Sequence, residues 1–315
     1  MASIIPAGQL AYGMQLQVQS KSKTFREPWE DDADSSAIAA LARQADAAGF
    51  FYIAVSDHVV VPKPMDAHMQ TTWYDTVATL GWLAGITQRA RLLSHVYVLA
   101  YRHPLHTAKS FMTLDELSGG RAILGTGVGH LQREFELLGL DFDARGAIAD
   151  ESIDVIRAAF TSEYPDVTTP RFGHVSDAGI APRPRQARVP IWVGGSSKAA
   201  LRRAAERGDG WLPQGTPRAE MPASIAYLLE HRKQTIGDEP IDLGAISEVF
   251  YVGEPTWDVG ARTFTGTAGR IADRLNEFGA MGVSHVQVRF RSRVLQEQLD
   301  QMAAFGAEVA PLLGR

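Results

Sequence analysis

The chain has 315 residues, no cysteine and a formal net charge of -5, with 45% hydrophobic and 21% charged residues. This composition is typical of a globular protein with a large core, and it argues against disorder. The lack of cysteine excludes disulfides, thiolate metal sites and a cysteine nucleophile. The mildly acidic balance argues against nucleic-acid binding.

Apolar residues alternate between the periods of strands and helices along most of the chain. The expected strands cover, in chain order, residues 11–18, 50–55, 91–99, 122–124, 190–193, 210–212, 245–252 and 283–290. The expected helices cover about residues 38–48, 75–87, 104–117, 150–160, 197–207, 219–235, 267–278 and 294–313. Glycine or proline marks most of the boundaries between them.

Two segments interrupt this alternation, at residues 57–73 and 161–188. The second is rich in proline and glycine and is expected to form a small hairpin. Eight successive strand–helix units favour parallel strands closed into a barrel. We therefore predict an α/β fold, a single-domain (β/α)8 TIM barrel over residues 1–315, with residues 57–73 and 161–188 as rim insertions. Its active site should lie at the carboxyl ends of the strands.

The N-terminal residues lack the basic start and apolar run of a signal peptide. No stretch approaches the ~18 consecutive apolar residues of a membrane span. We therefore expect a cytoplasmic protein that acts on a small-molecule substrate, with no nucleic-acid or membrane partner.

Polar and glycine-rich residues follow two of the expected strands. Asp57 and His58 follow the second strand, where a carboxylate beside an imidazole suits proton handling, or equally a turn cap beside an exposed histidine. Residues 125–130 follow the fourth strand, and their three alternating glycines either admit a ligand or form a flexible turn. The sixth position is His130 instead of glycine, which argues against a dinucleotide fingerprint.

The fifth strand is followed by Gly194, Gly195 and Ser196, and a helix then begins at Ser197. Backbone N–H groups at a helix N-terminus bind anions, so a phosphate group is favoured here over a plain N-cap.

Other polar residues do not form a metal or nucleotide motif. His103 and His106 lie three residues apart without a matching acidic ligand, so no metal site is expected. Arg102 is expected to pair with a carboxylate or to cap the following helix. The chain has no P-loop and no nucleophile-elbow sequence.

Six segments, taken together and in order, resemble the luciferase-like monooxygenase superfamily. They are residues 49–59, 101–104, 113–121, 125–129, 190–196 and 208–213. The Ser56-Asp57-His58 motif resembles the branch of that superfamily that uses the deazaflavin F420. The resemblance implies a (β/α)8 barrel, in agreement with the strand count, and a flavin-type cofactor across the carboxyl-end rim.

The resemblance also implies roles for particular residues. Asp57 would contact the cofactor ring, and His58 would lie near the hydride-accepting carbon. A cis peptide at His95–Val96 would support the ring, although relatives often have Gly or Ser where His95 stands, and its side chain would crowd a ring. The remaining implied cofactor-binding residues are Gly127, Gly129, Gly194, Gly195 and Ser196, the last three at the phosphate.

His130 departs from the pattern, because some F420-dependent relatives have Glu at this place and others have Trp. The resemblance therefore leaves His130, His58 or water as the proton donor. It implies a homodimer that transfers a hydride between F420 and a small unsaturated or carbonyl-type substrate. One alternative is an FMN-dependent monooxygenase supplied by a separate flavin reductase, and another is a cofactor-binding paralogue without catalysis.

Overall fold

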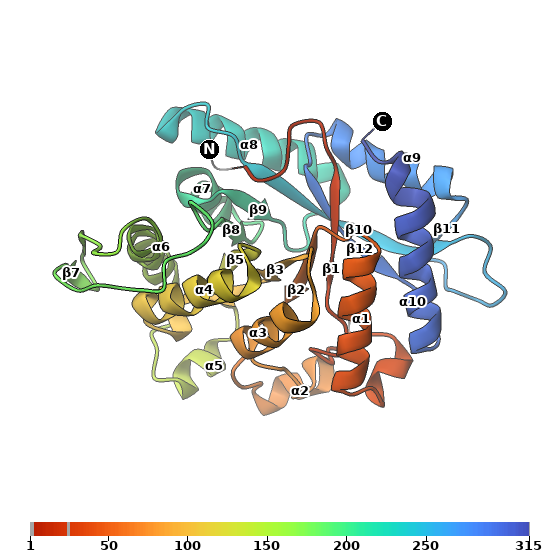
Figure 1. The fold of residues 1–315 in the computed structure, drawn as a ribbon, viewed down its shortest axis with the longest axis horizontal. Coiled ribbons are helices and arrows are strands. Elements are labelled where there is room, and N and C mark those ends of the chain that lie inside the picture. Colours follow the sequence, from red (N-terminus) through yellow and green to blue (C-terminus); the bar gives the residue numbers. More distant parts are fainter. Residues whose placement is uncertain (1–2, 24–25, 315) are drawn as a thin grey trace.

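A computed structural model of the protein describes residues 3–23 and 26–314 (Figure 1). Eight parallel strands form a closed barrel, because the last pairs with the first. In barrel order they are β1 (Ala11–Gln15), β2 (Tyr52–Val55), β3 (Arg91–Ser94), β5 (Ala122–Gly127), β8 (Ile191–Gly194), β9 (Gly210–Leu212), β10 (Asp242–Val252) and β12 (His285–Phe290). The predicted single-domain (β/α)8 TIM barrel is confirmed.

Helices surround the barrel and connect successive strands. They are α1 (Ser35–Ala47), α3 (Thr76–Ile86), α4 (Pro104–Ser118), α6 (Arg145–Thr161), α7 (Lys198–Arg207), α8 (Met221–Ile236), α9 (Ala268–Ala280) and α10 (Leu295–Ala304). Ser197 and Thr267 cap α7 and α9 through their side chains, as side-chain oxygens at this position commonly do. Asp34 caps α1 and accepts from the Ser36 N–H, so the expected cap at Ser35 or Ser36 is wrong by one or two residues.

Several short elements were not predicted. These are α2 (Lys63–Met69), α5 (Gln132–Leu137) and β11 (Thr263–Gly266). The expected hairpin in residues 161–188 is present as β6 (Val167–Thr169) paired with β7 (Gly173–Val175). In Figure 1, α2 and α5 lie at the same end of the molecule, and the β6–β7 hairpin projects beyond α6.

Two predicted elements are divided in the structure. The third strand ends at Ser94 and resumes as β4 (Tyr97–Val98), with the His95–Val96 peptide in the cis form. The last predicted helix, 294–313, is α10 followed by a π-helical turn, Phe305–Val309. A continuous apolar period does not reveal either change of backbone conformation.

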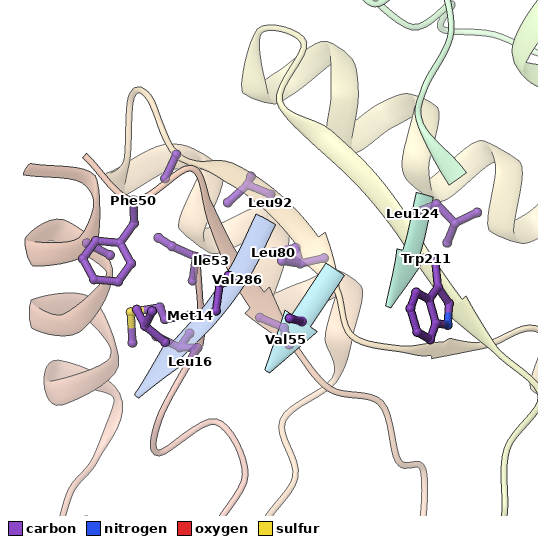
Figure 2. Close-up of a cluster of buried hydrophobic side chains, with 14 of the residues drawn as sticks. Met14, Leu16, Phe50, Ile53, Val55, Leu80, Leu92, Leu124, Trp211 and Val286 are labelled. Carbon is purple, nitrogen blue, oxygen red and sulfur yellow. The ribbon is translucent and has the colours of Figure 1, made fainter. Parts of the chain in front are cut away.

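The core has two parts, one outside the barrel and one within it. Outside, side chains such as Met14, Ile53 and Leu92 pack between the strands and helices (Figure 2). Inside, the Trp192 ring stacks on His285 with centroids 4.3 Å apart, and apolar neighbours fill the space around them. The barrel is therefore packed toward its N-terminal end, and a cavity of about 170 Å³ lies at the opposite end.

Candidate functional site

The bulge between β3 and β4, residues 94–98, forms part of the rim at the carboxyl end of the barrel. Ser94 Oγ donates to the Gly125 carbonyl at 2.8 Å, and Thr126 Oγ1 donates to the Tyr97 carbonyl at 3.3 Å. These bonds tie the bulge to β5. The cis peptide expected at His95–Val96 lies in this bulge and is confirmed.

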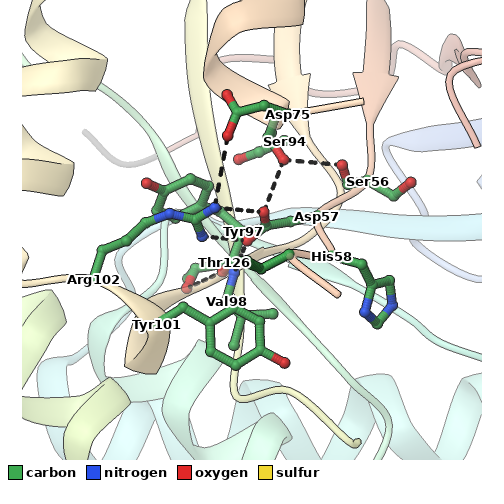
Figure 3. A network of polar contacts seen from close by, with 12 residues as sticks. Ser56, Asp57, His58, Asp75, Ser94, Tyr97, Val98, Tyr101, Arg102 and Thr126 are labelled. Carbon is green, nitrogen blue, oxygen red and sulfur yellow. Dashed lines mark hydrogen bonds and ion pairs between the residues drawn. The ribbon is translucent and has the colours of Figure 1, made fainter. Parts of the chain in front are cut away.

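Asp57 is buried beside the bulge and accepts four hydrogen bonds from three residues. Its carboxylate accepts from the Arg102 guanidinium at 2.6 and 2.9 Å, from the Val98 N–H at 2.9 Å and from Thr76 Oγ1 at 3.1 Å. Figure 3 shows Arg102 against this carboxylate, with its guanidinium 4.3 Å from the Tyr97 ring centroid. The expected pairing of Arg102 with a carboxylate is confirmed. Asp57 therefore fixes the bulge to the start of α4, and its contact with a cofactor ring stays a prediction.

His58 is held by a buried carboxylate that the sequence analysis did not identify. His58 Nδ1 lies 2.8 Å from Glu134 Oε2, and the Glu134 side chain is 0% exposed. Glu134 also accepts from the Tyr101 hydroxyl at 2.7 Å and from the N–H groups of Val59 and Val60 at 2.7 and 3.1 Å. This arrangement leaves His58 Nε2 as the ring nitrogen that can exchange a proton with a ligand.

The charge on Glu134 determines which hydrogen His58 donates. Burial acts to raise the pKa of Glu134, but hydrogen bonds and the charge of His58 outweigh it and lower the pKa below its ordinary 4.5. An ionised carboxylate only accepts hydrogen bonds, so His58 donates from Nδ1. Glu134 was missed because the short helix α5 was not predicted. Its position four residues after His130 is the sequence signal that could have identified it.

Two further rings lie against His58. The His130 ring is 5.5 Å from it and the Trp73 ring 4.5 Å, both edge to face. The structure thus brings together His58 and His130, the two predicted catalytic residues. Burial lowers the pKa of His130, and the charge of His58 lowers it further, so His130 is neutral near pH 7. Their participation in catalysis stays a prediction.

The predicted cofactor-binding glycines pack against the bulge. A Cβ atom at Gly127 or Gly194 would lie 2.5 Å from the Val96 side chain, and one at Gly129 would lie 2.7 Å from the Phe135 ring. Close packing therefore accounts for these glycines without a ligand. Their contact with a cofactor, and that of Val96, stay predictions.

The turn into α7 uses part of the backbone that was expected to hold a phosphate. The Gly195 N–H donates to the Leu212 carbonyl at 3.0 Å, and Ser196 Oγ bonds with the Gln214 backbone. Ser197 Oγ accepts from the Ala200 N–H at 3.2 Å, so the N-cap is present. A phosphate at Gly194, Gly195 and Ser196 stays a prediction, and the N–H groups of the first turn of α7 are those still oriented toward an anion.

His95 points toward the cavity at the mouth of the barrel, which we call the mouth cavity. This cavity lies between β1, β12 and the bulge, and its polar lining includes Gln15, Gln17, Ser56, His95 and Gln287. The sequence analysis named only His95 among these for a ligand. The sequence did not identify the glutamines as ligand contacts, because glutamine at the end of a strand is usually solvated.

Across residues 3–23 and 26–314, no cluster of three or more His, Asp and Glu side chains could hold a metal ion. In the same part of the chain, no helix is both long and apolar enough to cross a membrane.

Comparisons with known proteins agree with this architecture. The model of the luciferase-like monooxygenase family matches residues 14–255. An uncharacterized protein of Mycobacterium tuberculosis is 31% identical over 219 residues, which cover 66% of this chain and 75% of the relative. The family match includes β2, the bulge and α7.

Solved structures with low sequence identity share the fold. The coenzyme F420-dependent tetrahydromethanopterin reductase of Methanopyrus kandleri aligns with a TM-score of 0.72 at 20% identity, covering 96% of this chain and 99% of that one. The oxygenating constituent of 3,6-diketocamphane monooxygenase of Pseudomonas putida, solved with FMN, aligns with a TM-score of 0.75 at 14% identity, covering 97% and 99%. With a family model that matches most of its length, the chain belongs to the luciferase-like monooxygenase family.

Proposed function

We propose that the protein is an F420-dependent oxidoreductase that transfers a hydride between deazaflavin F420 and a small unsaturated or carbonyl-type substrate. The observation that carries this proposal is the orientation of His58. Its Nδ1 donates to a buried, ionised Glu134, so that Nε2 serves the ligand. Hydride addition to a carbonyl or imine also requires a proton, and an imidazolium whose Nδ1–H is held by Glu134 can supply it from Nε2–H.

The described residues fit a ring cofactor at this rim. The bulge provides an apolar surface through Val96, against which Gly127 and Gly194 pack closely. The N-terminus of α7 carries Lys198 and unbonded N–H groups in its first turn, which favour a phosphate. Reduced F420, when bound here, would supply the hydride.

The residues of the chain contribute orientation and the proton. His58 Nε2–H donates a proton to the substrate oxygen or nitrogen that becomes basic as the hydride arrives at carbon. Glu134 stabilises the protonated imidazole and keeps its Nδ1–H in place. His130, neutral near pH 7, lies beside His58 and returns a proton from solvent to it. Asp57 and Arg102 position the bulge and do not exchange protons.

The alternative is an FMN-dependent monooxygenase that receives reduced flavin from a separate reductase. The structural likeness to an FMN-bound oxygenase supports it, because the two barrels share the fold. A third possibility is a paralogue that binds cofactor without catalysis. It draws support from His130, which stands where some F420-dependent relatives have Glu.

Oxidation of reduced F420 by the purified protein, followed with a panel of enones, imines and ketones, tests the proposal. We expect cofactor oxidation that depends on one class of substrate and proceeds equally with and without oxygen. Turnover that requires both oxygen and reduced FMN would instead establish the monooxygenase. Tight cofactor binding with no turnover across the panel would favour the non-catalytic paralogue.

A further inference from the structure

The mouth cavity contains an unusual group of buried polar atoms. Gln15 Nε2, Gln17 Oε1, His95 Nε2 and Gln287 Oε1 are all buried in its lining, and of these side chains His95 and Gln287 contact each other through a hydrogen bond. Gln287 is only 6% exposed. Folded proteins pair nearly all buried polar groups, because an unpaired one destabilises the fold. The unpaired ends of Gln15 and Gln17, beside the His95–Gln287 pair, therefore indicate a ligand that satisfies them.

The hydrogen bonds around Gln17 determine which end of its amide faces the cavity. Gln17 Nε2 donates to Glu30 Oε1 at 3.2 Å, and a carboxylate can only accept, so Oε1 is the end left over. Gln17 Oε1 thus requires a donor from a ligand, and Gln15 Nε2 requires an acceptor. The ligand must supply at least one N–H or O–H group and one carbonyl-type oxygen.

A neighbouring glutamine shows that unpaired amides are not general at this rim. Gln19 Nε2 donates to the carbonyls of Ser56 and Tyr74, both at 3.1 Å, and its Oε1 accepts from Ser56 Oγ at 2.8 Å. The fold therefore satisfies Gln19 completely. It leaves Gln15 Nε2 and Gln17 Oε1 unsatisfied where their side chains line the cavity.

The charged groups that line the cavity have protein partners. Glu27 accepts from Arg291 at 2.9 and 3.1 Å, and Glu30 accepts from the N–H groups of Val18 and Glu27 at 3.0 and 2.8 Å. The negative charges of Glu27 and Glu30 act to raise the pKa of Arg289, against the lowering effect of burial. Burial lowers the pKa of His95 to about 4, so its imidazole is neutral near pH 7. The unsatisfied groups are therefore the neutral ones.

We propose that the mouth cavity binds the substrate and selects a neutral amide- or urea-type group, in which N–H donors stand beside a carbonyl acceptor. The cavity volume of about 170 Å³ leaves room for such a group. Ser56, which precedes Asp57 and His58 in the chain, lines the cavity. The assignment to substrate rests on the proposed function, whereas the preference for a neutral donor–acceptor group rests on the cavity alone.

Binding of three matched probes to cofactor-free protein tests the preference. The probes are 2-imidazolidinone, with two N–H groups and a carbonyl; cyclopentanone, with the same ring size and no donor; and cyclopentanecarboxylate, an anion. We expect 2-imidazolidinone to bind at least tenfold more tightly than either of the others, measured by calorimetry or ligand-detected NMR. Equal binding of the first two probes, or tighter binding of the anion, would overturn the proposal.

Two variants localise the effect and separate substrate from cofactor. Gln17→Met and Gln287→Met remove the cavity-facing oxygens at similar volume, and each should bring 2-imidazolidinone to within threefold of cyclopentanone. Gln234→Met, at an exposed position on α8, is the matched control and should change nothing. F420 affinity should be the same in all three variants as in the wild type. A fall in F420 affinity in both Gln17→Met and Gln287→Met would assign the cavity to the cofactor and refute the substrate assignment. If wild-type protein shows the probe preference and binds no F420, the cavity chemistry stands and the proposed function fails.

Discussion

The two sides of the barrel mouth differ in how their polar groups are satisfied. On the paired side, Asp57 with Arg102 and Glu134 with His58 form hydrogen bonds of 2.6–2.9 Å. On the open side, Gln15 and Gln17 each have a buried side-chain atom without a partner, beside the hydrogen-bonded pair of His95 and Gln287. Both sides are rich in polar residues, so composition alone does not distinguish them.

This difference separates the polar groups that stabilise the fold from those that are available to bind a ligand. A carboxylate with three or four partners is already paired by the fold, and its loss would disturb the protein itself. An amide with an unsatisfied end contributes little to folding and much to recognition. His58 belongs to the paired side through Nδ1, which is held by Glu134, and its proposed proton donation would use the other ring nitrogen.

The largest effect should come from His58→Ala. Removal of the proton donor should lower kcat by about 10²–10⁴-fold, typical of general acid catalysis. F420 affinity should change by less than about threefold, because the imidazole acts on the substrate. Steady-state kinetics and cofactor titration measure the two quantities separately. Unchanged turnover would remove His58 from the mechanism, and Glu134→Gln should fall between wild type and His58→Ala.

The next largest effect tests the paired side through Asp57→Asn. The substitution removes the buried partner of Arg102, which keeps only a longer 4.0 Å contact with the exposed Asp75, and it weakens the anchor of the bulge. It should therefore cost about 3–5 kcal/mol of unfolding free energy. Chemical denaturation measures this loss. Asp166→Asn is the matched control, because that carboxylate is 81% exposed and should cost almost nothing. An equally small loss at Asp57 would show that the paired side is not structural.

The dependence of the unfolding free energy on pH tests whether His95, on the open side, is buried and neutral. Burial lowers the pKa of His95 to about 4, against 6.5 when unfolded, so the unfolded chain binds a proton that the folded protein does not. His95 therefore makes its full contribution to the free energy of unfolding above pH 6.5, and this contribution is lost as the pH falls toward 4. Its size is roughly 3 kcal/mol. His95→Gln should reduce the fall in stability over this range by that amount, and the exposed His174→Gln should not. Parallel pH profiles for the wild type and His95→Gln would contradict a buried, neutral His95.

The smallest effect concerns the start of α7, where a cap and an anion site were both expected. Ser197→Asp and Ser197→Asn keep an oxygen that can cap the helix, so both should leave stability nearly unchanged. Only the aspartate adds a negative charge, and it should weaken F420 binding by several-fold. Equal affinities in the two variants would place the cofactor phosphate elsewhere.

The sequence was sufficient to predict the barrel, because each strand–helix unit carries its own apolar period and boundary residues. It also placed His58 and His130 at one rim, since both follow strands. It could not predict Glu134, because α5 is a six-residue helix without a strong apolar stripe. Nor could it show that Gly127 and Gly194 are needed to pack against Val96, since the same glycines would suit a ligand. Those distinctions depend on side-chain contacts between distant segments.

The structural role of Asp57 also could not be predicted from the sequence, because it depends on contacts with distant segments. Its position before His58 suggested a ligand contact, whereas its partners Thr76, Val98 and Arg102 lie 19 to 45 residues further along the chain. Gln15 and Gln17 were overlooked for the opposite reason. Their unpaired side-chain atoms become visible only when β1 and β12 meet in the closed barrel.

Parallel equilibrium titrations of the purified protein with F420 and with FMN test the central claim most directly. We expect one F420 to bind per chain and to bind at least tenfold more tightly than FMN. Stronger binding of FMN, or no binding of F420, would contradict the assignment of this rim to deazaflavin hydride transfer.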